Sequence, residues 1–113
     1  MAQDLTLMKC RLYPENTPPL DAAQIAQYAP AISPEWETVD NGKLRRLFAW
    51  NSFKEATFFF NAIAYLAEQE NHHPDVTVSY KRVTVELTTH DVGGLSLNDF
   101  IVAAKIDKLV ESA

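Results

Sequence analysis

The chain has 113 residues, with 15 acidic and 10 basic side chains and a formal net charge of −5. This length suits one domain built around one hydrophobic core. Hydrophobic residues make up 47% and charged residues 22%, which is the usage of an ordinary folded domain and argues against disorder. The acidic balance argues against direct nucleic-acid binding, because neutralising a phosphate backbone requires a surplus of Lys and Arg.

Cys10 is the only cysteine, which excludes an intramolecular disulfide and a zinc site made of several thiolates. A single cysteine is compatible with a reducing compartment. The N-terminal residues lack a basic segment followed by an apolar one, so they do not form a secretory signal. No apolar run approaches the roughly 20 residues that span a bilayer. These features predict a cytoplasmic protein that makes no membrane contact.

Residues 1–19 are predicted to form an irregular N-terminal arm, and residues 20–113 a single folded domain. Prolines at positions 14, 18 and 19 interrupt any regular element in the arm. Asp21 is a candidate N-cap for a short first helix that contains Ile25 and Tyr28 at helical spacing. Prolines at positions 30 and 34 end that helix.

A β-hairpin is predicted over residues 36–50, with its turn at Asp40-Asn41-Gly42. An Asn-Gly pair between two strand-like segments favours a tight turn, because both turn positions need a positive φ. Leu44 and Phe48 alternate in the second strand, but Arg46 falls between them at the same parity. The pattern therefore does not decide which face of this strand is buried.

A long helix running to about Gln69 is predicted, with Asn51 or Ser52 as its N-cap; Ser52 and Glu55 have the spacing of a capping box. Its apolar residues cover more surface than one sheet face can bury. A second helix or a second subunit is therefore expected to cover the remainder. One apolar stripe is formed by Phe53, Ala56, Phe60, Ile63, Ala64 and Ala67, and further apolar side chains lie beside it at Phe58, Phe59, Ala62 and Leu66.

A second hairpin is predicted over residues 76–88, with Lys81-Arg82 as a two-residue turn. This register places six apolar or aromatic side chains on one face, in direct cross-strand pairs. The predicted pairs are Tyr80 with Val83, Val78 with Val85, and Val76 with Leu87.

A final helix is predicted over residues 97–111, because Ser96 and Asp99 have capping-box spacing after the Gly93-Gly94 loop. The complete order is then α-β-β-α-β-β-α. Hairpins pair strands antiparallel, so this order predicts an α+β fold with helices packed on one face of a four-stranded antiparallel sheet.

The three histidines, His72, His73 and His90, are the candidate functional residues. Imidazoles titrate near neutral pH, so a cluster of them with Glu68 and Asp99 nearby suits general acid–base catalysis. A metal site would need three convergent ring nitrogens, which adjacent histidines supply poorly. A purely structural interpretation also stands, because histidines at a helix C-terminus favour its negative end. The residues alone do not show whether the three rings converge.

The stretch from Glu68 to Asp99 resembles the signature of the pterin-4a-carbinolamine dehydratases. In that signature a charged residue is followed after three residues by His, His or Asn, and Pro, which is the position of His72-His73-Pro74 here. An aromatic residue comes next, then nine residues, a His or Trp, a gap and an Asp. Tyr80, His90 and Asp99 occupy these positions. The resemblance extends over roughly residues 20–109.

The resemblance implies a dehydratase that removes water from a 4a-hydroxy-tetrahydropterin to give a quinonoid dihydropterin. It implies that His72 and His90 are the acid–base groups and that His73 binds and orients the substrate. It implies no metal and no redox cofactor, a homodimer or homotetramer, and a functional link to an aromatic amino-acid hydroxylase. The residues that would bind the substrate or orient the imidazoles are Glu68, Thr88, Thr89 and Asp99.

Two alternatives use the same fold. One is a non-catalytic dimerisation or regulatory partner with a vestigial pterin site. The other is a related step in a different pterin pathway, such as one linked to molybdopterin. Retention of all three histidines favours the enzyme, because a vestigial site could lose any of them without cost to folding.

Overall fold

The computed structural model describes residues 3–111. In these residues the order of helices and strands is α-β-β-α-β-β-α, as predicted. The elements are α1 (Ala22–Tyr28), β1 (Glu37–Val39), β2 (Lys43–Ala49), α2 (Phe53–Glu70), β3 (Asp75–Ser79), β4 (Arg82–Leu87) and α3 (Leu97–Glu111), with short 3-10 helices η1 (Leu5–Leu7), η2 (Ala29–Ala31) and η3 (His90–Val92).

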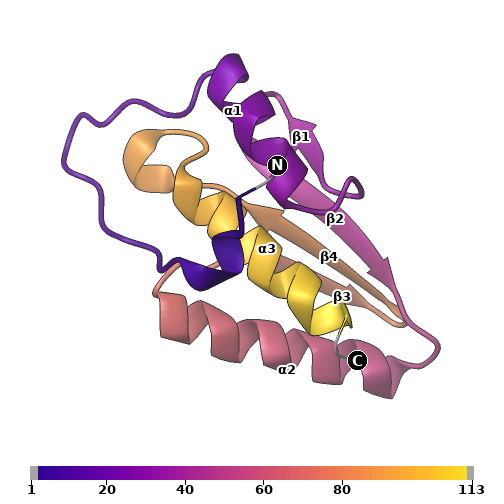
Figure 1. Ribbon diagram of the computed structural model, residues 1–113. Coiled ribbons are helices and arrows are strands. Elements are labelled where there is room, and N and C mark those ends of the chain that lie inside the picture. Colours follow the sequence, from indigo (N-terminus) through magenta and orange to yellow (C-terminus); the bar gives the residue numbers. More distant parts are fainter. Residues whose placement is uncertain (1–2, 112–113) are drawn as a thin grey trace.

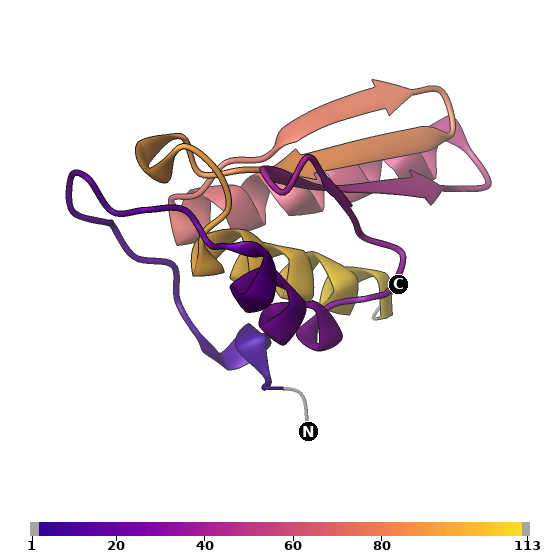
Figure 2. The ribbon, with the colours of Figure 1, turned by 90° about the horizontal axis from the view of Figure 1, so that it is seen from above.

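The four strands form one antiparallel sheet in the order β1-β2-β4-β3. Helices α2 and α3 lie side by side on one face of this sheet, and α1 and the arm lie on the side of α3 away from the sheet (Figures 1 and 2). This arrangement confirms the predicted α+β fold. It also explains why α3 is buried around most of its circumference over residues 98–104.

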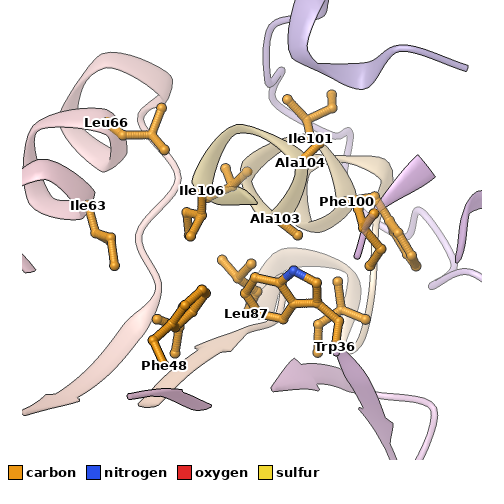
Figure 3. Close-up of a cluster of buried hydrophobic side chains, with 14 of the residues drawn as sticks. Trp36, Phe48, Ile63, Leu66, Leu87, Phe100, Ile101, Ala103, Ala104 and Ile106 are labelled. Atoms are coloured by element: carbon orange, nitrogen blue, oxygen red, sulfur yellow. The ribbon is translucent and has the colours of Figure 1, made fainter. Parts of the chain in front are cut away.

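The core lies between the sheet and the two long helices (Figure 3). Alternate residues of β4 face it, and Val83, Val85 and Leu87 are each 0% exposed. Leu44 and Phe48 of β2 face it at the same parity. Each such side chain contributes about 1.5–3 kcal/mol by leaving water, so the alternating pattern fixes which face of each strand points inward.

Arg46 shares this inward parity, which explains the break in the pattern of β2. Its Nη1 atom lies 2.7 Å from Oδ1 of Asp107 on α3, and its guanidinium lies 4.3 Å from the centroid of the Phe48 ring. Asp107 also accepts hydrogen bonds from the Trp36 indole at 2.7 Å and the Ser33 N–H at 2.8 Å. The charge is therefore paired at the edge of the core rather than exposed.

The first hairpin forms as predicted, although its left-handed residues are Asp40 and Asn41, at φ of 52° and 54°. Gly42 follows them and donates its N–H to the carbonyl of Val39 at 2.9 Å. The turn thus begins one residue earlier than the Asn-Gly pair indicates, because Asp and Asn both tolerate a positive φ.

The register predicted for the second hairpin is wrong by two residues. The turn is Tyr80-Lys81, with Tyr80 at φ 53°, and Val78 pairs with Val83 and Val76 with Val85. The neighbouring strand accounts for this result, because Arg82 pairs with Ala49 of β2 and so belongs to β4 rather than to the turn. A shift of two keeps the side chains of both strands on their predicted face, so that face is correct for the valines and Leu87. The prediction is wrong for Tyr80, which lies in the turn and is 67% exposed.

The apolar stripe named in the sequence of α2 is only partly buried. Phe53 is 54% exposed and Phe60 is 37% exposed, whereas Phe59 and Leu66, placed beside the stripe, are buried. The helix presents the line through Phe59, Ile63 and Leu66 to the sheet and α3. Phe58 and Tyr65 are 63% and 69% exposed, so the described residues leave much of the apolar surface of α2 uncovered.

The arm is more ordered than its prolines indicate. It contains η1, whose Leu5 is 1% exposed within the core cluster, and η1 packs against α3. Local sequence does not reveal this packing, because it depends on contacts with residues about 90 positions later in the chain. In the part of the chain that the structure describes, no helix is long and apolar enough to cross a membrane.

Candidate active site

The two adjacent histidines follow directly on the C-terminus of α2. Asn71 ends the helix in the left-handed conformation, at φ 51°, and its N–H and that of His72 both donate to the carbonyl of Ala67. Pro74 then prevents helical continuation and leads into β3. This geometry sends the two rings to different environments, since the His72 side chain is 12% exposed and the His73 side chain 56% exposed.

His72 is bound to Asp99, which lies in the first turn of α3. The His72 Nε2 atom is 2.6 Å from Oδ1 of Asp99, and Asp99 is 0% exposed. The predicted helix start supplies this carboxylate, because Ser96 donates its N–H to Oδ2 of Asp99 at 2.9 Å. One side chain therefore both caps α3 and binds the imidazole.

Thr89 lies two residues after the end of β4 and completes this hydrogen-bond network. Its hydroxyl lies 2.8 Å from Oδ2 of Asp99 and 2.7 Å from the Ser96 hydroxyl. Asp99 thus has hydrogen-bond partners at both oxygens, with Thr89 and Ser96 donating to Oδ2 and His72 lying at Oδ1. An ionised carboxylate only accepts, so Nε2 of His72 carries the proton in this contact and Nδ1 of the neutral ring keeps a free lone pair.

His73 pairs with Glu68 on the surface of α2. The His73 Nε2 atom lies 2.5 Å from Oε2 of Glu68, and the Glu68 side chain is 76% exposed. Beside this pair is a mainly apolar groove between α2 and β3, with a volume of about 320 Å³. The groove is lined by Phe60, Ile63, Ala64, Ala67, Glu68, His73, Pro74 and Val76.

His90 begins η3 immediately after Thr89 and is exposed. Its position is fixed by a closed loop, because Thr89 exchanges two main-chain hydrogen bonds with Gly94. Gly94 must lack a side chain, since an added Cβ would lie 2.9 Å from the Cβ of Pro19. The Thr88 hydroxyl donates to the carbonyl of Gly42 at 2.6 Å, which ties this loop to the first hairpin.

The contacts from Thr89 through Asp99 to His72 thus connect the end of β4 to the end of α2. The sequence alone does not show whether these two ends meet, and the structure brings them together. A model of the pterin 4 alpha carbinolamine dehydratase family matches residues 18–109, which include every one of these side chains.

The chain belongs to the pterin 4 alpha carbinolamine dehydratase family.

Similar proteins extend this relationship over nearly the whole chain. A protein of Alkaliphilus metalliredigens, provisionally named pterin-4-alpha-carbinolamine dehydratase, is 41% identical over 93% of this chain and 95% of its own length. One from Legionella pneumophila strain Corby, with the same provisional name, is 42% identical over 97% of this chain and 98% of its own.

Solved structures share the dehydratase fold. A crystal structure described as a transcriptional coactivator/pterin dehydratase from Brucella melitensis has a TM-score of 0.75 and 29% identity, covering 80% of this chain and 97% of that one. A pterin dehydratase-like protein described as a RuBisCO assembly factor in the alpha-carboxysome has a TM-score of 0.59 at 23% identity, covering 70% and 93%. The second likeness concerns the fold alone.

Sequence reasoning missed two buried polar residues near the dehydratase motif. Ser96 was considered only as a helix cap, although its hydroxyl contacts Thr89. Glu70, two residues before His72, is buried and accepts hydrogen bonds from Lys105 at 2.7 Å and from the Cys10 N–H at 2.9 Å. Capping-box spacing indicates the position of Ser96 but not the contact of its hydroxyl with Thr89, and no local pattern distinguishes a buried Glu70 from an exposed helix-end carboxylate.

No group of three or more His, Cys, Asp or Glu side chains within residues 3–111 is arranged to hold a metal ion.

Cys10 lies against the buried Glu70, which accepts the main-chain N–H of Cys10. Burial, together with the nearby Glu70 carboxylate, raises the pKa of the Cys10 thiol to about 12. This thiol is therefore a poor nucleophile at neutral pH.

Proposed function

We propose that this protein dehydrates 4a-hydroxytetrahydrobiopterin, or a closely related 4a-hydroxy-tetrahydropterin, to the quinonoid dihydropterin and water. The observation that carries the proposal is the 2.6 Å contact between His72 and the buried Asp99, within the family's motif. A fixed imidazole beside a buried carboxylate is suited to accepting and returning a proton. The protein is then a hydro-lyase that recycles the pterin used by an aromatic amino-acid hydroxylase.

The reaction breaks the bond between C4a and its hydroxyl oxygen and forms a double bond between C4a and N5. N5 loses its proton, and the departing hydroxyl gains one, so the balance is the loss of one water. Nδ1 of His72 is the proposed base at N5, because the Asp99 carboxylate stabilises the imidazolium that results. His90, exposed at the start of η3, is the proposed acid that protonates the hydroxyl.

The substrate-binding roles follow from exposure. His73, Glu68 and the apolar groove beside them are accessible, so they suit contact with the pterin ring and its polar edge. Thr88 lies at the loop that carries His90. Asp99 at 0% and Thr89 at 6% exposure are proposed to act through His72 rather than by touching the pterin.

We also propose that the side of α2 that carries Phe58 and Tyr65, seven residues apart, is a self-association surface. These two large side chains are 63% and 69% exposed, and exposed apolar surface of this kind marks a candidate protein interface. A homodimer or homotetramer would cover it, and a regulatory protein partner is the alternative occupant. Light scattering of the wild type and of Phe58→Asp distinguishes these, because self-association predicts a smaller particle for the variant.

Stopped-flow measurement on 4a-hydroxytetrahydrobiopterin tests the proposed reaction. Purified wild type should accelerate water loss over buffer, and His90→Ala should lose about 10²-fold or more in rate. Gln69→Ala, an exposed change on the last turn of α2, serves as the matched control and should retain full activity. A wild type that does no better than buffer would overturn the proposal.

A further inference from the structure

His72 follows the C-terminal end of α2 and Asp99 lies in the first turn of α3, so their contact depends on how the end of α2 packs against the start of α3. Two polar ties hold these ends together behind the pair. The first is Glu70, the last residue of α2, whose side chain is 3% exposed and lies 2.7 Å from the Lys105 ammonium on α3. Lys105 is six residues beyond Asp99, or about 9 Å further along the helix axis.

A negative charge at the position of Glu70 is unfavourable for two reasons. A carboxylate at a helix C-terminus faces the negative end of the helix dipole, and burying it costs solvation energy. Burial alone would raise the pKa of the Glu70 carboxyl, but hydrogen bonds from Lys105 and from the Cys10 N–H hold it below its ordinary value. The ionised Glu70 side chain is therefore stabilised in this buried position by both Lys105 and the Cys10 N–H.

The second tie is Asn98, the residue before Asp99, which is 5% exposed. Its Oδ1 accepts the N–H of Arg11 at 3.0 Å, and its Nδ2 donates to the carbonyl of the same residue at 2.7 Å. Consecutive main-chain N–H groups of the arm, those of Cys10 and Arg11, thus donate to one side chain from each helix. The arm therefore connects α2, which leads into His72, to α3, which carries Asp99.

The start of the arm is independently anchored. Leu5 of η1 is 1% exposed in the core cluster, and η1 packs along α3. Figure 1 shows this segment crossing the face of α3 before the arm turns away towards α1. The part of the arm that makes these contacts, residues 5–11, also lies outside residues 18–109, which the family model matches.

We propose that residues 5–11 of the arm, with Glu70, Lys105 and Asn98, form a positioning clamp that sets the approach of His72 to Asp99. The clamp makes the arm part of the active-site scaffold, although none of its residues touches the substrate. This inference rests on the proposed dehydratase function for its kinetic consequence. Its structural consequence, the position of the His72 ring, can be measured without any turnover.

Asn98→Ala is the most direct test, because it removes both contacts to Arg11 and leaves Asp99 in place. We expect kcat to fall about tenfold while KM stays within about twofold, since the substrate contacts remain and only the alignment of the base is lost. The Nε2 proton resonance of His72 should broaden or shift. Cys10 should react faster with a thiol reagent as the arm is released, and Gln69→Ala should change none of these values.

Glu70→Gln is the second variant, in case Asn98→Ala fails to fold by circular dichroism. It keeps an acceptor for the Cys10 N–H but removes the charge that binds Lys105, so it should show the same changes in kcat and in the His72 resonance. Faster thiol labelling with unchanged kcat and an unchanged His72 resonance would overturn the clamp. If the wild type is inactive, the dehydratase proposal fails, but the clamp proposal does not fail with it. The clamp is then tested by whether the His72 resonance changes in the variants.

Discussion

His72 and His73 are neighbours in sequence, and each is bound through Nε2 to a carboxylate, yet the two pairs differ in almost every other respect. The His72 and Asp99 side chains are 12% and 0% exposed, and the His73 and Glu68 side chains are 56% and 76% exposed. Asp99 receives two further hydrogen bonds from Thr89 and Ser96, whereas the structure gives Glu68 no other side-chain contact.

The difference shows that the residue type alone does not define a catalytic pair. A solvent-exposed ion pair is screened by water and easily rearranged. A buried carboxylate with hydrogen-bond partners at both oxygens can fix the tautomer and direction of an imidazole. The buried pair is therefore the proposed catalytic unit, and the exposed pair has a role in binding.

The largest expected effect separates the two histidines. His72→Ala should lower kcat by about 10²-fold or more, because it removes the proposed base. His73→Ala should lower kcat by less than about tenfold and act mainly by raising KM. Steady-state kinetics on the pterin substrate measures both, and equal losses of kcat would show that burial does not separate the two roles.

The buried Glu70 and the exposed Glu68, both on α2, should also differ in how much each contributes to the free energy of unfolding. Glu70→Gln should lower the free energy of unfolding at pH 7 by about 2 kcal/mol, since the buried Lys105 loses its charged partner. Because the pKa of Glu70 is lower in the folded state, this contribution is present above its ordinary value of 4.5 and is lost as pH falls below it.

Urea unfolding at several pH values measures this difference. The gap between wild type and Glu70→Gln should narrow as pH decreases from 4.5 through the folded-state pKa of this group. Glu68→Gln is the matched control and should leave the unfolding free energy nearly unchanged at each pH. A gap that widened in acid would contradict the assigned pairing of Glu70.

The smallest expected effect concerns the hydroxyl behind Asp99. Thr89→Val keeps the shape of the side chain but removes the donor to Asp99, and should cost about 1 kcal/mol of stability and roughly fivefold in kcat. Thr84→Val, on the opposite face of β4, is the control and should change neither value. A fully active Thr89→Val would show that the Thr89 hydroxyl does not contribute to catalysis through Asp99 and His72.

The sequence predicted the fold from local signals that the structure confirms. The caps at Asp21 and Ser52 and the order of the elements all depend on residues close together in the chain. The turn at Tyr80-Lys81 was predicted wrongly, because its position is decided by the pairing of Arg82 with Ala49 in the neighbouring strand. No window around the hairpin contains that information.

The site was predictable as a set of residues but not as an arrangement. The spacing from Glu68 to Asp99 identified the candidates through family resemblance, and adjacent histidines leave a helix end in different directions. Which of them meets Asp99 depends on the conformation of Asn71 and on contacts between two helices. The buried Glu70 and the arm that binds it are long-range features of the same kind.

The most direct measurement compares kcat for Asp99→Asn and Glu68→Gln, two identical chemical changes in the two pairs. Ser96 and Thr89 require an oxygen acceptor from residue 99, so the amide of Asp99→Asn must turn its NH₂ towards His72. The imidazole then carries its proton on Nδ1 and loses its lone pair for N5. We expect kcat to fall about 10²-fold for Asp99→Asn and less than about fivefold for Glu68→Gln. A folded Asp99→Asn with wild-type kcat, or equal losses in both variants, would contradict the account.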